Sequence, residues 1–247
     1  MTEPLERLDE GGIAILTLNR PDQLNALSPE LFLALRAAVD DIAGDEAIGC
    51  VVIRGAGRSF CAGYDLKSRE RAREILPPNF GGQTVAAMAA LPQPVIAAVH
   101  GHCFTGGLEL ALAADFIIAA ETTRFADTHA KWGMRATWGM TQRLPRRIGA
   151  AAAKDLMFTG REINGREALA LGLVSRCVAD DSLEAAALEA ARAVVERSGP
   201  AVRWIKDQVD QGADLSLAEA LKREAVRRPA GAAETDTRLQ RAGWVKP

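Results

Sequence analysis

Two glycine-containing loops and one glutamate have the residue types and spacing of a site that handles a carbonyl group. The loops span residues 57–66 and 100–110, and each follows a predicted strand. Thr105 can cap a helix that begins at Gly106, so the Gly106 amide is expected to be an unpaired donor at a helix start. Glu109 lies three residues later, about one turn along on the same face. The amide and the carboxylate are therefore expected to point into one space.

A second amide would complete this arrangement. If the Tyr64 amide of the first loop faces the same space, two main-chain donors can hold a developing enolate or oxyanion, and each such donor is worth on the order of 10²–10³ in rate. The geometry suits a thioester, because the amides polarise its carbonyl while the carboxylate moves a proton at the neighbouring carbons. Spacing alone leaves a plainer interpretation open, in which the glycines only make turns and Glu109 only offsets the helix dipole.

The elements that must position these loops alternate between helix and strand up to about residue 120. Short apolar or alternating runs predict strands at 5–9, 13–18, 50–54, 95–99 and 116–119, and helical spacing predicts helices at 29–43, 83–91 and 106–114. Residues 55–64 and 100–105 are expected to be loops. This alternation predicts an α/β fold with strands that are at least partly parallel.

Beyond Thr141 the pattern predicts helices alone, at 150–159, 166–171, 181–198, 201–211 and 216–226. Ser216 and Glu219 have the spacing of a capping box. We therefore divide the chain into an α/β core, residues 1–199, and a helical C-terminal part, residues 200–247. Several of these helices are short and rich in Ala and Leu, so they need packing partners within the chain or on another copy of it.

Composition argues against several other classes of function. The 247 residues include 30 Lys and Arg against 32 Asp and Glu, a balance that argues against a nucleic-acid partner. No apolar run approaches the roughly 20 residues that span a bilayer, and the N-terminus lacks the cationic start of a secretion signal. The four cysteines have no paired spacing. We therefore expect a protein of the reducing cytoplasm with no membrane partner.

Three other motifs could mark sites. His100 and His102 could face one side of a strand as metal ligands, but no further histidine lies nearby except His129 and no Cys-x-x-Cys is present, so no metal is expected. Cys61 is expected to be a small buried thiol rather than a nucleophile. Gly55-Ala-Gly57 lacks the remaining glycine of a dinucleotide-binding fingerprint.

At the two glycine loops and several flanking segments, the sequence resembles the crotonase superfamily, the enoyl-CoA hydratase/isomerase family. The matching segments follow one another in order along nearly the whole chain: Leu18-Asn-Arg-Pro21 with Leu24-Asn-Ala-Leu27, Ser59-Phe-Cys-Ala-Gly-Tyr-Asp-Leu66, Gln93-Pro-Val-Ile-Ala-Ala-Val-His-Gly101, Gly106-Gly-Leu-Glu-Leu110 with Ala114-Asp115, Gly139-Met-Thr-Gln-Arg-Leu144, Thr159-Gly160 and Ala168-Leu-Ala-Leu-Gly-Leu-Val174. Linked matches in the right order make this resemblance specific.

The resemblance implies a spiral of ββα units in residues 1–199, a helical trimerisation region after it, and homotrimers that often pair into hexamers. It also implies an acyl-CoA thioester substrate, with coenzyme A entering as part of the substrate and no separate cofactor. By motif, Tyr64 and Gly106 supply the oxyanion-hole amides, and Glu109 matches the first catalytic glutamate. The residues expected to border the substrate are Ala62, Gly63, Leu66 and Gly107.

The chain departs from the family pattern one segment later. Alignment without gaps from Phe125 to Leu144 puts His129 where a typical hydratase carries its second glutamate. A histidine has an ordinary pKa near 6.5, so it can give and take a proton near neutrality. His129 could therefore act as the acid, place the water, or only line the pocket.

Several residues near His129 and the first loop have open roles. Trp132 and Trp138 could narrow the acyl pocket or support it from behind, and Arg135 could pair with an acidic acyl group or lie on the surface. Asp127 could be catalytic or make a structural hydrogen bond at a turn. A basic run could be a solvated face, or one or two of its cations could meet the phosphates of coenzyme A; it comprises Lys67, Arg69, Arg71 and Arg73.

We interpret the chain as a crotonase-fold enzyme, an enoyl-CoA hydratase in which Glu109 activates water and His129 or Glu109 itself protonates the α carbon. The rival within the fold is a double-bond isomerase, because one carboxylate can carry a proton between two carbons without water. A hydrolase, lyase or decarboxylase of the same fold stays open. The rival from another class is a catalytically silent acyl-CoA binding protein.

Overall fold

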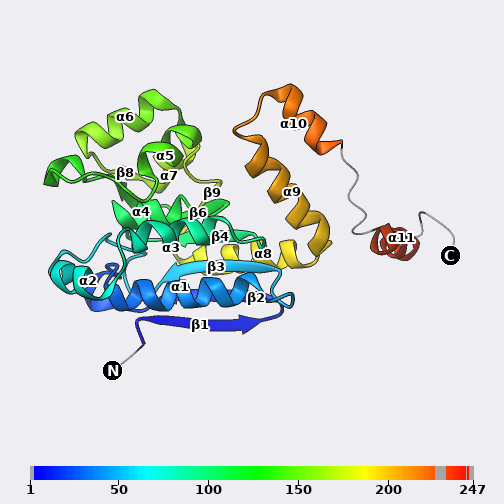
Figure 1. Cartoon of the computed structure of the whole chain (residues 1–247), viewed down its shortest axis with the longest axis horizontal. Coiled ribbons are helices and arrows are strands. Elements are labelled where there is room, and N and C mark those ends of the chain that lie inside the picture. The colour runs from blue at the N-terminus through cyan, green and yellow to red at the C-terminus, as the bar shows by residue number, and fades with distance from the viewer. Residues whose placement is uncertain (1–2, 226–231, 243, 245–247) are drawn as a thin grey trace.

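A six-stranded sheet lies at the centre of the molecule (Figure 1), in a computed structural model that describes residues 3–225, 232–242 and 244. Its strands, in spatial order, are β1 (Leu5–Glu10), β2 (Ile13–Leu18), β3 (Cys50–Gly55), β4 (Val95–Val99), β6 (Phe116–Ala120) and β9 (Arg176–Val178). β1 and β2 form an antiparallel hairpin, and every later pair is parallel. The predicted α/β layering with mostly parallel strands is confirmed.

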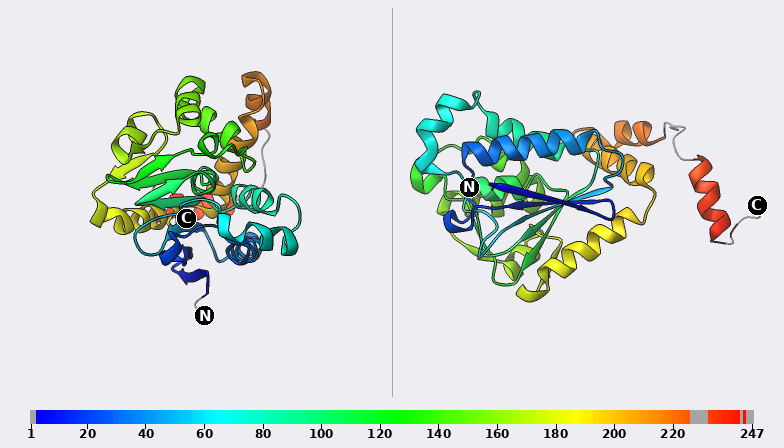
Figure 2. Two further views of the ribbon diagram at one scale, coloured as in Figure 1. Left: turned by 90° about the vertical axis from the view of Figure 1, so that its left-hand side faces the viewer. Right: turned by 90° about the horizontal axis from the view of Figure 1, so that it is seen from below.

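Helices cover both faces of this sheet (Figure 2), so its inner strands are apolar on both sides. Val51 and Ile53 of β3 point to a core shared with α1 (Pro29–Ala43), α3 (Phe80–Ala89) and α4 (Gly106–Ala111). Cys50 and Val52, on the opposite face, pack in the core beneath α8 (Leu183–Val195). The alternation along one strand thus fixes which helix layer each residue meets.

A second, three-stranded sheet carries the site and was not predicted. It has the order β5 (His102–Phe104), β7 (Arg124–Ala126) and β8 (Ile163–Asn164), with β5 parallel to β7 and β7 antiparallel to β8. The prediction of a loop throughout residues 100–105 is therefore wrong. A strand of three residues is too short to show a hydrophobic period, and its pairing with β7 is a tertiary feature.

Helix boundaries differ from the predictions at several places. α4 ends at Ala111 rather than near Ala114, because the chain tightens there: the Ala113 amide bonds to the Leu110 carbonyl at 3.2 Å. α3 begins and ends earlier than the expected 83–91. Two further helices, α2 (Arg69–Ile75) and α5 (Met140–Ile148), were not predicted as such.

The part of the chain beyond Thr141 is mostly helical, but the prediction of helices alone there is wrong, because the strands β8 and β9, too short to show a hydrophobic period, also lie within it. It contains α6 (Ala150–Thr159), α7 (Gly165–Ala170), α8, α9 (Gly199–Gly212), α10 (Leu217–Glu224) and α11 (Ala232–Arg241). The capping box is present, since Ser216 and Glu219 bond to each other's amides at the start of α10. Val226, the expected end of that helix, lies outside the described residues. Figure 1 shows α9 and α10 standing beside the body formed by the sheets and their helices.

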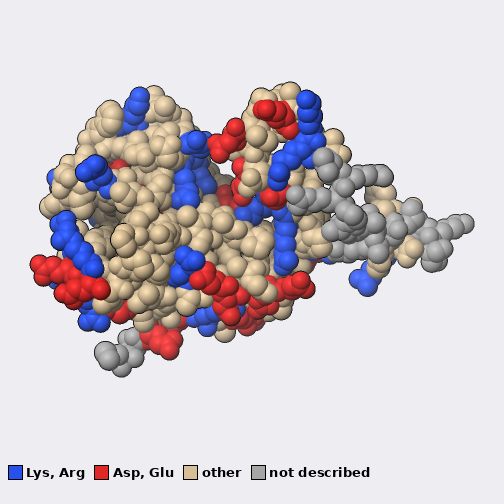
Figure 3. All heavy atoms as spheres, in the orientation of Figure 1, with Lys and Arg blue, Asp and Glu red and all other residues tan. Residues whose placement is uncertain are grey.

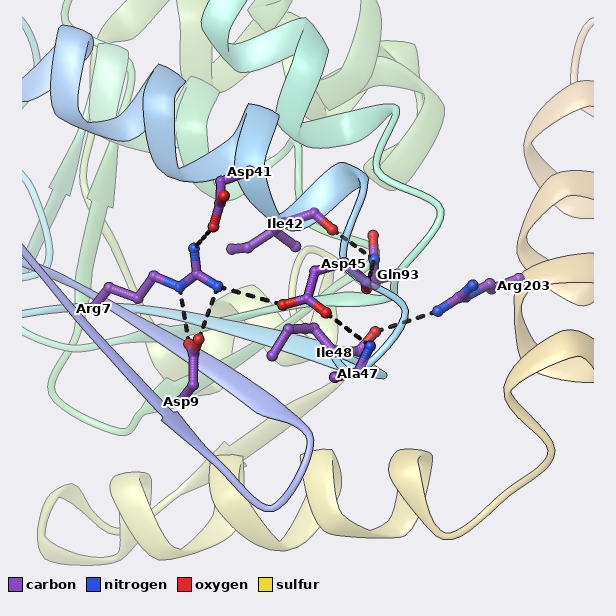
Figure 4. A network of polar contacts seen from close by, with 9 residues as sticks. All are labelled: Arg7, Asp9, Asp41, Ile42, Asp45, Ala47, Ile48, Gln93 and Arg203. Carbon is purple, nitrogen blue, oxygen red and sulfur yellow. Dashed lines mark hydrogen bonds and ion pairs between the residues drawn. The ribbon is translucent and has the colours of Figure 1, made fainter.

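Charges are mixed across the face drawn in Figure 3, where Lys and Arg alternate with Asp and Glu rather than gathering into one basic area. Figure 4 shows one such cluster, in which Arg7 of β1 donates hydrogen bonds to Asp9 and Asp41, forms an ion pair with Asp45 at 4.0 Å, and so ties the edge strand to the end of α1. Among the described residues, no helix combines the length and apolar character needed to cross a membrane.

Candidate active site

Glu109 lies in the first turn of α4, and its side chain is only 1% exposed. Its Oε1 atom accepts hydrogen bonds from the Trp138 amide at 2.8 Å and from the Met140 amide at 3.1 Å. These two bonds hold the carboxylate in one orientation. Burial raises the pKa of Glu109, although the two amides and the charge of His129 partly offset that effect.

His129 follows β7 and lies opposite Glu109, with its Nε2 atom 3.8 Å from Glu109 Oε2. Its Nδ1 atom lies 2.5 Å from Oδ1 of Asp127. Burial disfavours the imidazolium, but the bond to Asp127 and the charges of Asp127 and Glu109 outweigh it and raise the pKa of His129. A separation of 3.8 Å exceeds a direct hydrogen bond, yet one water can reach both atoms. The two side chains are therefore placed to share a water.

Tyr64 and Gly106 bring two main-chain amides beside these side chains. The Leu27 amide bonds to the Gly63 carbonyl at 2.8 Å and the Asp65 amide to the Leu27 carbonyl at 3.1 Å, which fixes the first loop without using the Tyr64 amide. Gly106 is the first residue of α4. Within the described residues neither amide donates a hydrogen bond, so both remain as donors for a ligand.

The two loops meet backbone against backbone, which requires glycine at their contact. Gly63 has a φ of +102°, and a Cβ there would lie 2.9 Å from the Phe104 carbonyl oxygen and 3.3 Å from the Gly106 nitrogen. A Cβ on Gly106 would lie 3.3 Å from the Tyr64 nitrogen. The two amide nitrogens are thus close neighbours, as a shared carbonyl oxygen needs.

Thr105 turns the chain from β5 into α4 in a strained backbone conformation, with φ of 52° and ψ of −111°. Its amide bonds to the Ala126 carbonyl at 2.8 Å, and its hydroxyl lies 2.6 Å from the hydroxyl of Thr128. These bonds join the residue before Gly106 to Ala126 and Thr128, in the segment that leads to His129. Strain at such a position is maintained because the surroundings over-determine it.

A cavity of about 550 Å³ collects most of the residues expected at the site. The predicted residues that line it are Ala62, Tyr64, Leu66, Gly106, Glu109, His129, Trp132 and Trp138. Gly63 and Gly107 were expected to border the substrate, but they lie behind this wall. A Cβ on Gly107 would lie 2.3 Å from the Cys61 carbonyl oxygen, so this glycine serves the close packing of the two loops.

A second cavity, of about 860 Å³, adjoins the first and was missed from the sequence. The two share Tyr64, Thr137 and Trp138 as lining residues, and the apolar wall of the second includes Phe32, Leu76, Pro77 and Phe80. The Trp138 ring packs edge-on against Phe32 at 5.0 Å and Tyr64 at 5.9 Å between ring centroids. The Pro77-Pro78 pair directly after Ile75 and Leu76 was the available signal for this wall.

The two histidines and the cysteine of the other candidate motifs make contacts that support the fold. His102 Nδ1 lies 2.8 Å from the Ser59 hydroxyl and its Nε2 lies 3.1 Å from Arg124, while His100 Nε2 lies 2.9 Å from the Gly57 carbonyl oxygen. Cys61 is buried as predicted, and burial raises its pKa to about 12.

The basic run divides into separate roles. Arg71 pairs with Glu30 at 2.7 Å, Arg69 lines the first cavity and Arg73 lines the second. Arg135 is exposed at the rim and lines the first cavity. The cationic side chains therefore do not form one continuous face.

This combination of fold and site places the chain among crotonase-fold proteins, and solved structures agree. It superposes on an enoyl-CoA hydratase from Bacillus anthracis with a TM-score of 0.89 at 35% identity, covering 97% of this chain and 95% of that one. It also superposes on a monofunctional enoyl-CoA isomerase from Mycobacterium smegmatis with a TM-score of 0.78 at 33% identity, covering 89% and 99%.

The sequence agrees with the structural likeness. The family described as enoyl-CoA hydratase/isomerase matches residues 9–238. The chain is 40% identical over 218 residues to a probable enoyl-CoA hydratase of Rhizobium meliloti, and the matched region covers 87% of this chain and 84% of that protein. The chain therefore belongs to the enoyl-CoA hydratase/isomerase family, and it is an enzyme of the hydratase or isomerase type. The predicted family and fold are confirmed.

Proposed function

We propose that the protein adds water to the double bond of a 2-enoyl-CoA thioester. The observation that carries this proposal is the pair of Glu109 Oε2 and His129 Nε2, 3.8 Å apart beside two free loop amides. Hydration needs a held water, a base for one of its protons and a donor for the α carbon. With one water held between these two atoms, Glu109 can serve as the base and His129 as the donor.

In the proposed reaction, the thioester oxygen lies between the amides of Tyr64 and Gly106, which stabilise the enolate. Glu109 takes a proton from the water as the water oxygen bonds to the β carbon and the carbon–carbon double bond opens. His129 then gives a proton to the α carbon, and the enolate returns to the thioester. The proton on Glu109 then passes to His129, directly or by exchange through solvent, which restores both groups. Addition of water is neither an oxidation nor a reduction, so we propose that no redox cofactor or metal takes part.

The second candidate is double-bond isomerisation between 3-enoyl-CoA and 2-enoyl-CoA. The feature that favours it is the histidine at the position of the second glutamate, since Glu109 alone can move a proton between two carbons. In that case His129 lines the pocket or tunes Glu109 without handling water. The two reactions differ in their products, and so the choice is open to direct measurement.

The test incubates the protein with matched 2-enoyl-CoA and 3-enoyl-CoA thioesters in water enriched in ¹⁸O and reads the products by mass spectrometry. We expect a 3-hydroxyacyl product that carries the heavy oxygen, and a loss of about 10²-fold or more in Glu109→Gln. Glu184→Gln, on the outside of α8, is the matched control. Consumption of the 3-enoyl substrate alone, without a hydroxyacyl product, would make the protein an isomerase. Absence of turnover, with unchanged thioester affinity in Glu109→Gln, would make it a binding protein.

We also propose the setting in which this enzyme works: a cytoplasmic homotrimer, alone or paired into a hexamer. Residues 1–199 would carry the thioester site and residues 200–247 the contacts between copies. Support comes from apolar side chains that α9 and α10 leave exposed, among them Ile205, Val209 and Leu217. Arg69, at the first cavity, is the member of the basic run best placed to meet a phosphate of coenzyme A.

A further inference from the structure

Asp127 holds both the main chain and the ring of His129 with a single oxygen. The carboxylate follows β7 and is 2% exposed. Its Oδ1 atom accepts from the His129 amide at 3.1 Å and lies 2.5 Å from His129 Nδ1. The first contact closes a short side-chain-to-backbone turn, and the second contact fixes the rotation of the imidazole. A purely structural aspartate at a turn needs only the first.

The contact at Nδ1 also decides which ring nitrogen carries a proton. A carboxylate accepts hydrogen bonds and does not donate them when ionised, so Nδ1 must be the protonated nitrogen. Nε2 is then left toward Glu109 Oε2, 3.8 Å away. In the neutral ring Nε2 has a lone pair that can receive a proton, and in the imidazolium it has a proton to give.

The loop that bears this pair is fixed to the oxyanion-hole side of the site. The Thr105 amide bonds to the Ala126 carbonyl, and the hydroxyls of Thr105 and Thr128 are 2.6 Å apart. Asp127 thus lies between two residues that are tied to the start of α4. An imidazole held by this segment has little freedom to move relative to Gly106 and Glu109.

We propose that Asp127 is a positioning residue for the reaction: it keeps His129 protonated at Nδ1 and aims Nε2 at the water beside Glu109. An aspartate and a histidine together then do the work that one carboxylate does in a typical hydratase. This inference rests on the proposed function, because it assumes that His129 handles a proton. The charged groups facing His129 are Asp127 on its own segment and Glu109 on α4; Arg143 of α5 acts on Glu109, and the cavity wall adds Arg69 and Arg135.

The test uses Asp127→Asn, which keeps an oxygen for the His129 amide but removes the negative charge and can donate to Nδ1. We expect kcat to fall about 10²-fold or more, as happens when a buried carboxylate that orients a catalytic histidine is made neutral, with KM changed only a few-fold. If His129 acts as the acid, activity is lost as pH rises through its pKa, and removal of Asp127 lowers that pKa. The alkaline limb of the kcat/KM profile should therefore move to lower pH.

Three further measurements separate this inference from the proposed function. Asp180→Asn, whose carboxylate bonds to Thr122 away from the cavity, should leave rate and profile unchanged. The double variant Asp127→Asn/His129→Gln should be no slower than His129→Gln, because a positioning residue acts only through its partner. Ring nitrogen NMR of the unmodified protein should show the neutral imidazole protonated at Nδ1, and this readout needs no variant to fold.

The outcomes are distinct. Full activity in His129→Gln would remove His129 from the proposed hydration step. A slow His129→Gln beside an Asp127→Asn with normal rate and normal pH profile would overturn the positioning role while leaving hydration intact. A neutral ring protonated at Nε2 in the unmodified protein would overturn it as well.

Discussion

At the scale of single residues, the buried surroundings of Glu109 disfavour the ionised form that the proposed reaction needs. Burial favours the neutral acid, while the amides of Trp138 and Met140 favour the carboxylate, and the net effect is a raised pKa. A carboxyl whose pKa is higher in the folded than in the unfolded protein gives stability that is present below its unfolded pKa. That stability is lost as the pH rises through the folded pKa. The residue therefore destabilises the fold in the ionised state that the reaction needs.

Glu109→Gln should consequently not weaken the fold, although it lowers turnover about 10²-fold or more. The amide oxygen of Gln can accept from both main-chain donors, and the buried charge disappears. We expect the unfolding temperature of the variant to equal or exceed that of the parent, with a gap that widens from pH 4 to pH 8 as Glu109 ionises in the parent. Calorimetry at several pH values checks this. A variant that is less stable at every pH would contradict the placement of Glu109 as a strained, functional carboxylate.

The residues of the site differ in how far the sequence could predict them. The relation of Glu109 to Gly106 was predictable because a glycine loop before a helix defines it locally, whereas Tyr64 lies in the other loop and could be placed beside them only through the family resemblance. The pairing of Asp127 with His129 is also local, yet its direction depends on a ring rotation that no spacing determines. Gly63 and Gly107 were expected to border the substrate but do not line the first cavity; a glycine required for contact with a substrate and one required for contact with another loop look alike in the sequence.

At the scale of elements, the close contact of two loops is the feature on which the amide pair depends. Gly107 sits where α4 begins and faces the Cys61 carbonyl, with 2.3 Å available to an added Cβ. Any side chain there must push the first loop away from α4 and separate the Tyr64 and Gly106 amides. Gly199, at the start of α9, has no atom within 4 Å of an added Cβ and is a natural control.

Gly107→Ala should therefore lower stability and activity together, by roughly 1–3 kcal/mol in unfolding free energy, the usual cost of overpacking a tight site. Gly199→Ala should be neutral or slightly stabilising in the same denaturation experiment, because alanine restricts the unfolded chain. Thioester hydration measured on both variants would show the loss in Gly107→Ala alone. A fully active, fully stable Gly107→Ala would mean that the two loops do not need this contact.

The main chain and the side chain of Trp138 have separate roles. Its amide holds Glu109, whereas its ring stands between the two cavities and packs against Phe32 and Tyr64. Trp138→Ala keeps the amide and removes the ring, so the two cavities should merge. We expect the ratio of rates on a ten-carbon and a four-carbon enoyl-CoA to rise at least about tenfold, within the range that extra methylenes contribute in apolar pockets. An unchanged ratio in a competition assay would show that the acyl chain does not pass Trp138.

The main elements were predictable where a segment is long and its period clear, as in β2, β4, α1 and α6. The three-stranded sheet of β5, β7 and β8 was not, because strands of two or three residues exist only through their partners. The same reason explains the missed second cavity, whose wall comes from α1, the segment around Pro77 and the loop at Trp138. The local sequence can indicate each of these segments, but only the tertiary structure brings them into contact.

At the scale of the whole molecule, α9 is held to the body by polar contacts of a few long side chains. Lys206 pairs with Asp115 at 2.8 Å and bonds to the Gln93 carbonyl at 3.2 Å, and Arg203 reaches the Ile48 carbonyl (Figure 4). No residue of α9 or α10 is fully buried. Helices of this length are marginal in water without an apolar partner. A single copy of the chain therefore lacks the apolar contacts that would stabilise α9 and α10.

The exposed apolar residues of α9 and α10 recur at the spacing of a packing face. Ile205 and Val209 lie four residues apart on α9, and Leu217 and Leu221 lie four apart on α10, all of them more than half exposed. Such a pattern is expected when the covering surface belongs to another copy of the chain. Replacing Leu217 and Leu221 together with glutamate should therefore lower the mass in solution from that of a trimer or hexamer to that of a monomer, as read by light scattering.

Leu33→Glu, on the exposed side of α1, serves as the matched control for this variant, since it also introduces a charge at a partly exposed leucine but lies in the body. It should leave the mass unchanged. The double variant keeps every residue that lines the site, so its activity per chain should fall only if α9 and α10 become less ordered. Chemical cross-linking before dilution should preserve the assembled mass of the parent alone. A parent that is already monomeric, or a double variant that keeps the full mass, would refute assembly through these helices and leave their apolar face to be covered from within the chain.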